Sequence, residues 1–239
     1  MDPAIVRNLL QEIERKDLST AAHTWRVVLY TRAMAEAFGI DHEQIALITQ
    51  AAAMHDIGKL DLPDSVLQKP GKLTDEEFEI IKYHPVSGYA RMIDLDVTEE
   101  PILDLVRYHH ERWDGLGYPF QLAGDDIPIG AQIFAVIDSF DAMTSVRPYR
   151  STVGDSAAQA ALVELQAGMG TRYATDAVEA FTHLFQSGSL DYILHYFNDR
   201  VPLPAFEHAR DVQFEAIRAR HSKVNIDSIN TDSINSNST

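Results

Sequence analysis

Histidine and aspartate side chains recur along the chain in a pattern that could bind metal ions. Five of the ten histidines and two aspartates form this set: His23, His55, Asp56, His84, His109, His110 and Asp138. Neutral imidazole is a good ligand for transition metals, and one carboxylate has enough oxygen atoms to serve two ions. Together these side chains could hold two metal ions.

The centre of this set is the run His55-Asp56-Ile57-Gly58-Lys59, which follows a mostly apolar stretch. Taken alone, the run also fits a core helix that reaches the surface and ends at Gly58, and that reading is then the favoured one. Adjacent residues on a helix point about 100° apart. Near a helix end His55 and Asp56 could therefore reach neighbouring ions, with Asp56 as the natural bridge.

The other members of the set also have structural explanations, of different strength. His84 could simply interact with the dipole of a helix end. The adjacent His109 and His110 would repel each other if both were protonated, and a metal requires neutral imidazoles, so the pair favours ligation. Asp138 and Asp141 lie three residues apart on a strongly apolar helix, where polar groups need a partner. A lone histidine is most often a surface or satisfied core residue, which leaves five unassigned: His42, His183, His195, His208 and His221.

The elements that must position these residues read as helices, and strand signals are scarce. Apolar spacing and capping residues predict two helices with recognisable starts, one from a cap at Ser19 or Thr20 to Gly39 and one from a cap at Asp41 to the His55 run. Further helices are predicted at residues 3–15, 74–84, 86–94, 100–110, 131–143, 156–165, 175–185 and 204–220. Thr74 and Glu77 have the spacing of a capping box. The expected fold class is therefore all-α.

Loops and the chain end complete the predicted organisation. Residues 60–71 should form a loop with at most a short helical turn, and residues 111–130 hold four glycines and two prolines, too many for one regular element. The polar end, residues 225–239, should be disordered. We expect a domain at residues 1–193 that includes the N-terminal helix, a C-terminal helical extension at 194–224, and the tail.

The composition limits the classes of function. The 239 residues are 45% hydrophobic and 23% charged, as in a globular protein, and include no cysteine, which excludes disulfides and thiolate metal sites. The net charge of −16 argues against nucleic acid polymers and anionic membranes as partners. A few local cations beside metal ions could still bind a small anionic substrate. Without a long apolar stretch or a signal-like start, we expect a cytoplasmic protein that does not insert into membranes.

The combined motifs resemble a known family. They are His23, His55-Asp56-Ile57-Gly58-Lys59, His84-Pro85, His109-His110-Glu111, Asp114-Gly115-Leu116-Gly117-Tyr118-Pro119, Ile127-Pro128 and Asp138-Ser139-Phe140-Asp141-Ala142. This pattern is similar to the HD-GYP family, bacterial cyclic di-GMP phosphodiesterases within the HD superfamily of metal-dependent phosphohydrolases. The similarity covers residues from about 15 to 190.

The resemblance implies an HD-domain helical bundle with a long GYP loop, here residues 111–130, and a metal centre of two or three ions, commonly iron or manganese. By motif, it assigns His23, His55, Asp56 and Asp138 to one ion, and Asp56, as a bridge, with His84, His109 and His110 to the other. Relatives with a third ion carry a glutamate four residues before the first histidine. Ser19 occupies that position here, so two divalent ions are expected.

The resemblance also implies how the reaction proceeds. Metal ions lower the pKa of bound water, so the implied reaction is attack of a metal-bound hydroxide on the phosphodiester. Asp56 and Lys59 are the predicted catalytic residues. Lys59 follows His55 by four residues and could hold a non-bridging phosphate oxygen, although a solvated lysine is the alternative.

Further substrate contacts follow from the same resemblance. Tyr118 and the glycines around it form the GYP loop, which would shape the site, although a surface turn is the alternative. Arg147 and Arg150 could contact the dinucleotide or could be surface charges at a helix end. Asp141 is expected to support the metal ligands.

The predicted function is hydrolysis of cyclic di-GMP to pGpG and then GMP. Alternatives are an HD-type hydrolase of another cyclic dinucleotide such as cyclic GMP-AMP or of a mononucleotide, and a catalytically silent module that senses the dinucleotide or binds a partner. The interpretation also allows a protein partner at the GYP loop and a homodimer.

Overall fold

Helices form all of the regular structure in the part of the chain that a computed structural model describes, residues 3–17, 21–145 and 155–196. The α-helices are α1 (Pro3–Asp17), α2 (Ala21–Ala37), α3 (His42–Met54), α4 (Asp64–Leu67), α5 (Asp75–Ile81), α6 (His84–Asp94), α7 (Glu100–Tyr108), α8 (Ile129–Thr144), α9 (Asp155–Ala167), α10 (Thr175–Gln186) and α11 (Asp191–Tyr196). Two 3-10 helices, η1 (Ile57–Asp61) and η2 (Gly124–Asp126), join them. Within these ranges strand pairing is limited to two isolated bridges, Asp114 with Ala123 and Met169 with Tyr173. The predicted all-α class is confirmed.

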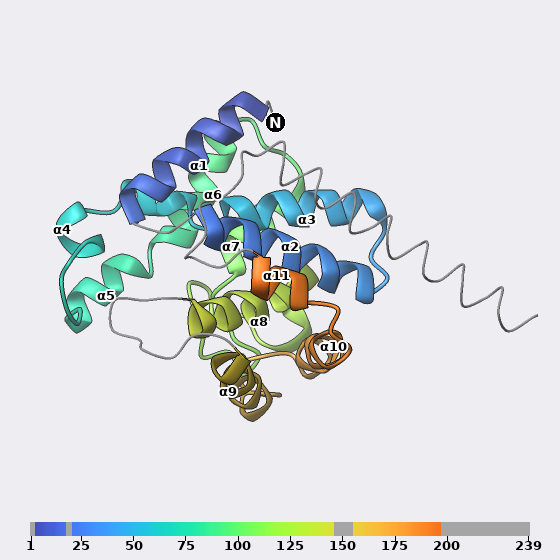
Figure 1. Ribbon diagram of the computed structural model, residues 1–239. Helices are drawn as coiled ribbons and strands as arrows, with labels where there is room; N and C mark the ends of the chain where they lie inside the picture. The colour runs from blue at the N-terminus through green and yellow to red at the C-terminus, as the bar shows by residue number, and fades with distance from the viewer. Residues whose placement is uncertain (1–2, 18–20, 146–154, 197–239) are drawn as a thin grey trace, which may run out of the picture. The chain divides into compact units, whose positions relative to one another are not determined.

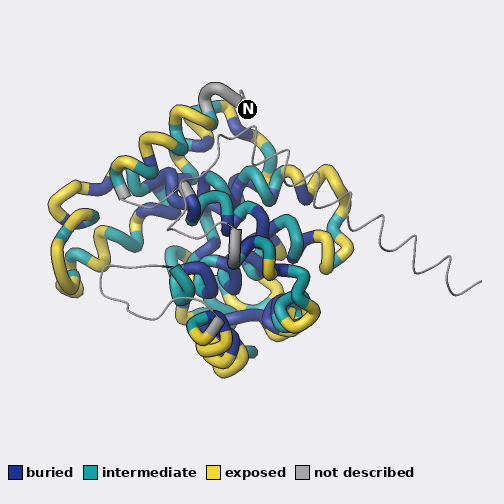
Figure 2. The backbone as a smooth tube through the Cα atoms, viewed as in Figure 1, coloured by how far each residue is buried: buried dark blue, intermediate teal, exposed yellow. Residues whose placement is uncertain are grey.

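The core forms where α2, α3, α7 and α8 meet (Figure 1). Helix α2 packs against α3 and α8, and α7 packs against α3 and α8. Large apolar side chains fill the contacts without exposure, among them Tyr30, Met54, Leu105, Phe134 and Phe140. Buried backbone in Figure 2 is concentrated in these helices, whereas α5 buries none of its residues. The helices that build the core therefore also carry, or end beside, most of the candidate metal ligands.

Local sequence signals account for several helix boundaries. The side chain of Asp41 accepts hydrogen bonds of 3.0 Å from two backbone N–H groups in the first turn of α3. Thr74 and Glu77 form the predicted capping box at the start of α5, with bonds of 2.8 and 3.3 Å. Gly39 follows α2 with a φ of 68°, a conformation that glycine adopts without steric cost. These three predictions are confirmed.

Other boundaries differ from the prediction. Helix α6 begins at His84 rather than at residue 86. Pro85 is tolerated there because the backbone N–H groups in the first turn of a helix have no intrahelical partner, so the N–H that proline lacks is not needed. Helix α7 ends at Tyr108, before the histidine pair. Helix α4 is the short helical turn expected in residues 60–71, whereas η1 and α11 were not predicted. The predicted helix at 204–220, the extension beyond residue 196, the tail and the caps at Ser19 and Thr20 lie outside the described residues.

All described elements belong to one unit of the chain, Met1–Val201. None of the helices described in it combines the length and apolar character that crossing a bilayer requires.

Candidate metal centre and substrate pocket

Two groups of histidine and aspartate side chains converge in the structure. One group is His23, His55 and Asp56, and the other is His84, His109 and His110; in each, the ligand atoms lie within 4.8 Å of one another. Asp56 lies between the groups, with Oδ2 at 3.0 Å from His55 Nε2 and Oδ1 at 3.4 Å from His84 Nε2. This is the placement that a bridging carboxylate would need.

The ends of three helices orient three of the imidazoles. The last turn of a helix leaves backbone carbonyls without intrahelical partners. Each of these histidines uses Nδ1 to donate to the carbonyl three residues earlier: His55 to Ala52 at 2.8 Å, His84 to Ile81 at 2.8 Å and His109 to Val106 at 3.0 Å. Because a carbonyl only accepts, the proton of the neutral ring is on Nδ1, and Nε2 keeps its lone pair for a metal.

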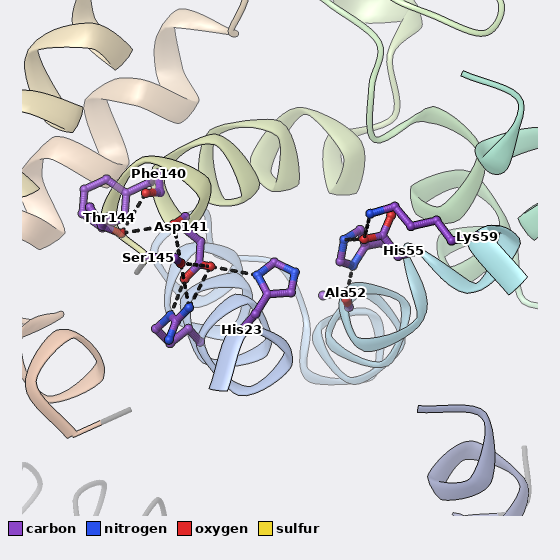
Figure 3. Close-up of polar contacts among 10 residues, drawn as sticks. His23, Ala52, His55, Lys59, Phe140, Asp141, Thr144 and Ser145 are labelled. Atoms are coloured by element: carbon purple, nitrogen blue, oxygen red, sulfur yellow. Dashed lines mark hydrogen bonds and ion pairs between the residues drawn. The ribbon is translucent and has the colours of Figure 1, made fainter. Parts of the chain in front are cut away.

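His23 is oriented by a carboxylate instead. Its Nδ1 donates to Oδ2 of Asp141 at 2.8 Å. Figure 3 shows His23, on α2, between Asp141, on α8, and His55. Asp141 is buried, and its carboxylate also accepts hydrogen bonds from Arg26 and from Ser145 Oγ. Burial alone would raise the pKa of Asp141, but the hydrogen bonds and charges of His23 and Arg26 hold that pKa well below its usual value. With Nδ1 bonded to this carboxylate, Nε2 is the ring nitrogen that could coordinate an ion in the first group.

The electrostatics of the second group fit a bound cation. Burial lowers the pKa of His84 to about 4, and burial also holds the pKa values of His109 and His110 well below the ordinary value, so all three imidazoles are neutral at pH 7. Nε2 of His84 lies 3.1 Å from Nε2 of His109. With both Nδ1 atoms protonated, two lone pairs face each other, and a cation that both nitrogens coordinate would remove this repulsion.

The first group behaves differently without an ion. Burial would lower the pKa of His55, but the Asp56 carboxylate outweighs this effect and raises it. The pKa of Asp56 is in turn held well below its usual value, because His55 and Lys59 outweigh the effect of burial. A metal ion would take the place of the proton that this ion pair otherwise holds. The residues present therefore suit divalent ions in both groups.

A pocket of about 460 Å³ adjoins the second group. Its lining includes His109, His110 and Asp138. Asp138 belongs to neither three-residue group, but its charge contributes to the raised pKa of His55, which places it near the first group. Lys59 lies at the site as well, with Nζ 2.8 Å from Oδ2 of Asp56. The predicted substrate contacts Arg147 and Arg150 lie outside the described residues.

The GYP loop closes one side of this pocket. The ring of Tyr118 stacks on His110 with centroids 4.7 Å apart. A Cβ atom on Gly117 would lie 2.3 Å from the backbone nitrogen of Arg112, so only glycine allows this close approach, and Gly115 has a φ of 74°. The backbone therefore requires glycine at position 117 and favours it at position 115.

Sequence reasoning assigned no role to Glu111 or Arg26, which support the site. Glu111 is buried, and its carboxylate accepts from the backbone N–H groups of Phe120 at 2.7 Å and Leu122 at 3.1 Å, which fastens the GYP loop beside the histidine pair. Its place directly after His110 was the available signal. Arg26 follows His23 by three residues, the spacing of one helix face.

The fold and the two groups define an all-α domain built around a histidine–aspartate pair. The sequence matches the HD domain family over residues 7–176, and the chain belongs to this family.

Comparison with individual proteins confirms the HD-GYP resemblance. The chain is similar to the cyclic di-GMP phosphodiesterase of Thermotoga maritima, with 42% identity over 183 residues that cover 75% of this chain and 48% of that protein. It is also similar to the 3'3'-cGAMP-specific phosphodiesterase 2 of Vibrio cholerae, with 36% identity over 180 residues, 73% of this chain and 33% of that protein. The chain thus spans about half or less of the length of these relatives.

Solved structures support the fold. The crystal structure of the cyclic GMP-AMP-specific phosphodiesterase V-cGAP3 of V. cholerae matches with a TM-score of 0.64 at 14% identity, over 87% of this chain and 52% of that chain. At this level of identity the similarity concerns the fold alone.

Proposed function

We propose that the chain is a metal-dependent phosphodiesterase domain that hydrolyses cyclic di-GMP to pGpG and then to GMP. The observation that carries the proposal is the position of the Asp56 carboxylate between two histidine groups, 3.0 Å from His55 and 3.4 Å from His84. The relative from T. maritima, which bears the name of this activity, supports the choice of substrate.

The side chains that would hold two ions are His23, His55, Asp56 and Asp138 for one, and Asp56, His84, His109 and His110 for the other. These nitrogen and oxygen donors suit iron or manganese, which we propose as the native metals. Bound there, two divalent ions would lower the pKa of a water nucleophile and neutralise charge on the phosphoryl oxygens.

The remaining residues of the site position the substrate and the ligands. The ammonium of Lys59, already within 2.8 Å of Asp56, is placed to pair with a non-bridging phosphate oxygen. Asp141 fixes the ring of His23 through a 2.8 Å bond, and Tyr118 fixes a wall of the pocket through its stacking on His110. Arg147 and Arg150 remain predicted contacts to the dinucleotide.

Turnover by metal-loaded protein tests this proposal. Protein purified without oxygen and loaded with Mn²⁺ or Fe²⁺ should convert cyclic di-GMP to pGpG and GMP, measured by chromatography. Asp56→Ala should abolish product, and Lys59→Ala should lower kcat by roughly 10²-fold, the typical effect of removing one charge-stabilising group. His42→Ala is a control, because His42 is exposed and belongs to neither metal group. Absence of product from the wild type with either metal would refute the proposal.

A second candidate substrate is cyclic GMP-AMP, which the 36% identical V. cholerae relative favours through its name. Competition between the two dinucleotides in one reaction, read as the ratio of kcat/KM values, decides between them. Tight binding without hydrolysis would instead favour a sensing module. The cytoplasmic location, the partner at the GYP loop and the homodimer stay predictions.

A further inference from the structure

The pocket has two walls that no part of the metal centre requires. One wall comes from α5 and the residue after it, and presents Phe78 and Lys82. The other comes from the turn before α10 and presents Arg172 and Tyr173. A volume of about 460 Å³ is within the usual range of sites for small organic ligands.

Cations gather in this pocket although the protein carries a net charge of −16. Three of them line it, and each is held by a carboxylate close to it in sequence: Lys82 by Glu79 at 2.5 Å, Arg112 by Asp114 at 2.6 Å and Arg172 by Glu164 at 2.6 Å. Their side chains are 31 to 37% exposed, so a ligand can reach them. The pairing fixes where each positive charge lies before any ligand arrives.

Aromatic rings accompany the cations on both walls. The guanidinium of Arg172 lies 5.5 Å from the ring centroid of Tyr173, and Nζ of Lys82 lies 5.1 Å from that of Phe78. Phe78 is 44% exposed, so a ligand in the pocket can contact its ring. An exposed ring such as Phe78 can stack on the face of a nucleobase, and a fixed donor such as Arg172 can hydrogen bond to its edge.

The wall at Arg172 is held in place by the GYP loop. The backbone N–H of Asp114 donates to the carbonyl of Thr171 at 2.8 Å, and Met169 forms a bridge with Tyr173. Gly168 is needed because a Cβ there would lie 2.7 Å from the ring of Tyr173. The turn is thereby fixed to the loop that also carries Tyr118.

We propose that Arg172 with Tyr173, and Lys82 with Phe78, form the nucleobase-binding walls of the cyclic dinucleotide site. Phe78 stacks on a purine, whereas Tyr173, which is only 6% exposed, packs against the guanidinium of Arg172 and positions it. Arg172 donates to a base edge, because its planar fork matches the adjacent O6 and N7 acceptors of guanine, and Lys82 supplies a further donor. This inference rests on the proposed function.

Kinetics with two substrates tests the assignment. Bis(p-nitrophenyl) phosphate contains a phosphodiester but no purine, so it requires the metal centre without the base walls. Arg172→Ala and Lys82→Ala should each raise KM for cyclic di-GMP by roughly tenfold, the effect of losing one good base contact, with kcat within about twofold. Turnover of bis(p-nitrophenyl) phosphate should stay at the wild-type rate. Equal losses on both substrates, or none on cyclic di-GMP, would overturn the inference.

Two further variants sharpen the test. Arg32→Ala is the matched control, since Arg32 is 36% exposed, pairs with Glu36 at 2.9 Å and does not line the pocket, and it should behave as the wild type. Arg172→Lys keeps the charge but loses the planar fork. It should resemble Arg172→Ala; wild-type kinetics would show that Arg172 binds phosphate by charge alone and would overturn the base contact.

Equilibrium binding separates this inference from the proposed function. Calorimetric titration of metal-free protein with cyclic di-GMP should show weaker binding by Arg172→Ala than by Arg32→Ala. If the metal-free wild type binds cyclic di-GMP, Arg172→Ala weakens this binding and the metal-loaded wild type forms no product, the proposed function fails and the base walls stand. If the wild type hydrolyses cyclic di-GMP and the wall variants match the control, only the inference fails. A wild type that neither binds nor hydrolyses it overturns both.

Discussion

Gly58 lies directly against the backbone of His84. A Cβ atom on Gly58 would be 1.9 Å from the carbonyl oxygen of His84 and 2.5 Å from the nitrogen of Gly88. Ser87 completes the contact by donating from Oγ to the carbonyl of Gly58 at 3.1 Å. The turn that follows His55 and Asp56 is therefore packed onto the first turn of α6, so the main chain joins the two histidine groups.

Replacing this glycine should disrupt both groups. Gly58→Ala places a methyl group against backbone atoms that cannot move without shifting α6, so we expect a loss of roughly 3 kcal/mol or more in the free energy of unfolding in urea. Gly130→Ala is the control, because its Cβ would meet only the side chain of Ile48, at 3.4 Å or more. Unchanged stability and metal content in Gly58→Ala would contradict the packing described.

The buried pair of Arg26 and Asp141 should matter for stability and for metal binding separately. Asp141→Asn leaves the 6% exposed guanidinium of Arg26 without its carboxylate, which should lower the free energy of unfolding by about 3–5 kcal/mol. It also leaves His23 less firmly oriented, so metal affinity should fall about 10- to 100-fold.

The double variant Arg26→Met with Asp141→Asn distinguishes the two effects. Without the buried guanidinium it should recover part of the stability and none of the metal affinity. Urea unfolding and competition with a chelator measure the two quantities. Recovery of metal affinity would show that Asp141 does not act through His23.

Glu111 should control the order of the GYP loop. Glu111→Gln replaces one of two carboxylate oxygens with an NH2 group, which cannot accept from the backbone N–H groups of Phe120 or Leu122. Hydrogen exchange should accelerate by roughly tenfold at whichever of these two amides loses its acceptor, consistent with the loss of one charge-assisted bond. The amides in the first turn of α3, capped by Asp41, serve as the internal reference, and equal exchange in wild type and variant would count against this role.

Several features followed from the sequence alone. The helices, the Asp41 cap and the Thr74 capping box depend on contacts between residues close in the chain, which spacing and residue type reveal. The histidine set was visible because five imidazoles fell at helix ends or on a helical stripe. The pairing of Arg26 with Asp141 was not visible, since the two are separated by 115 residues. The approach of Arg172 to the pocket likewise depends on how a distant turn packs against Asp114, which local patterns do not encode.

Adding a metal ion should stabilise the protein through the second group. With Nε2 of His84 and His109 only 3.1 Å apart, the metal-free state contains a repulsion that a cation relieves. Saturation with Mn²⁺ at 100 times the dissociation constant should add about 2.7 kcal/mol, seen as a rise in Tm. His109→Ala should lose most of this rise, whereas His183→Ala, an exposed residue of α10, should keep it. An equal rise in both variants would exclude His109 as a ligand.

The carbonyl groups that orient His55, His84 and His109 belong to the main chain, so the side chains of Ala52, Ile81 and Val106 take no part in aiming the ligands. The direction of each imidazole is thus encoded by where a helix stops and not by the identity of a neighbouring residue. Substitutions inside these helices can accumulate without redirecting a ligand. Insertion of a single residue into a last turn, by contrast, would rotate the imidazole by about 100°. Homologous sequences should therefore tolerate substitutions at these positions far better than insertions or deletions.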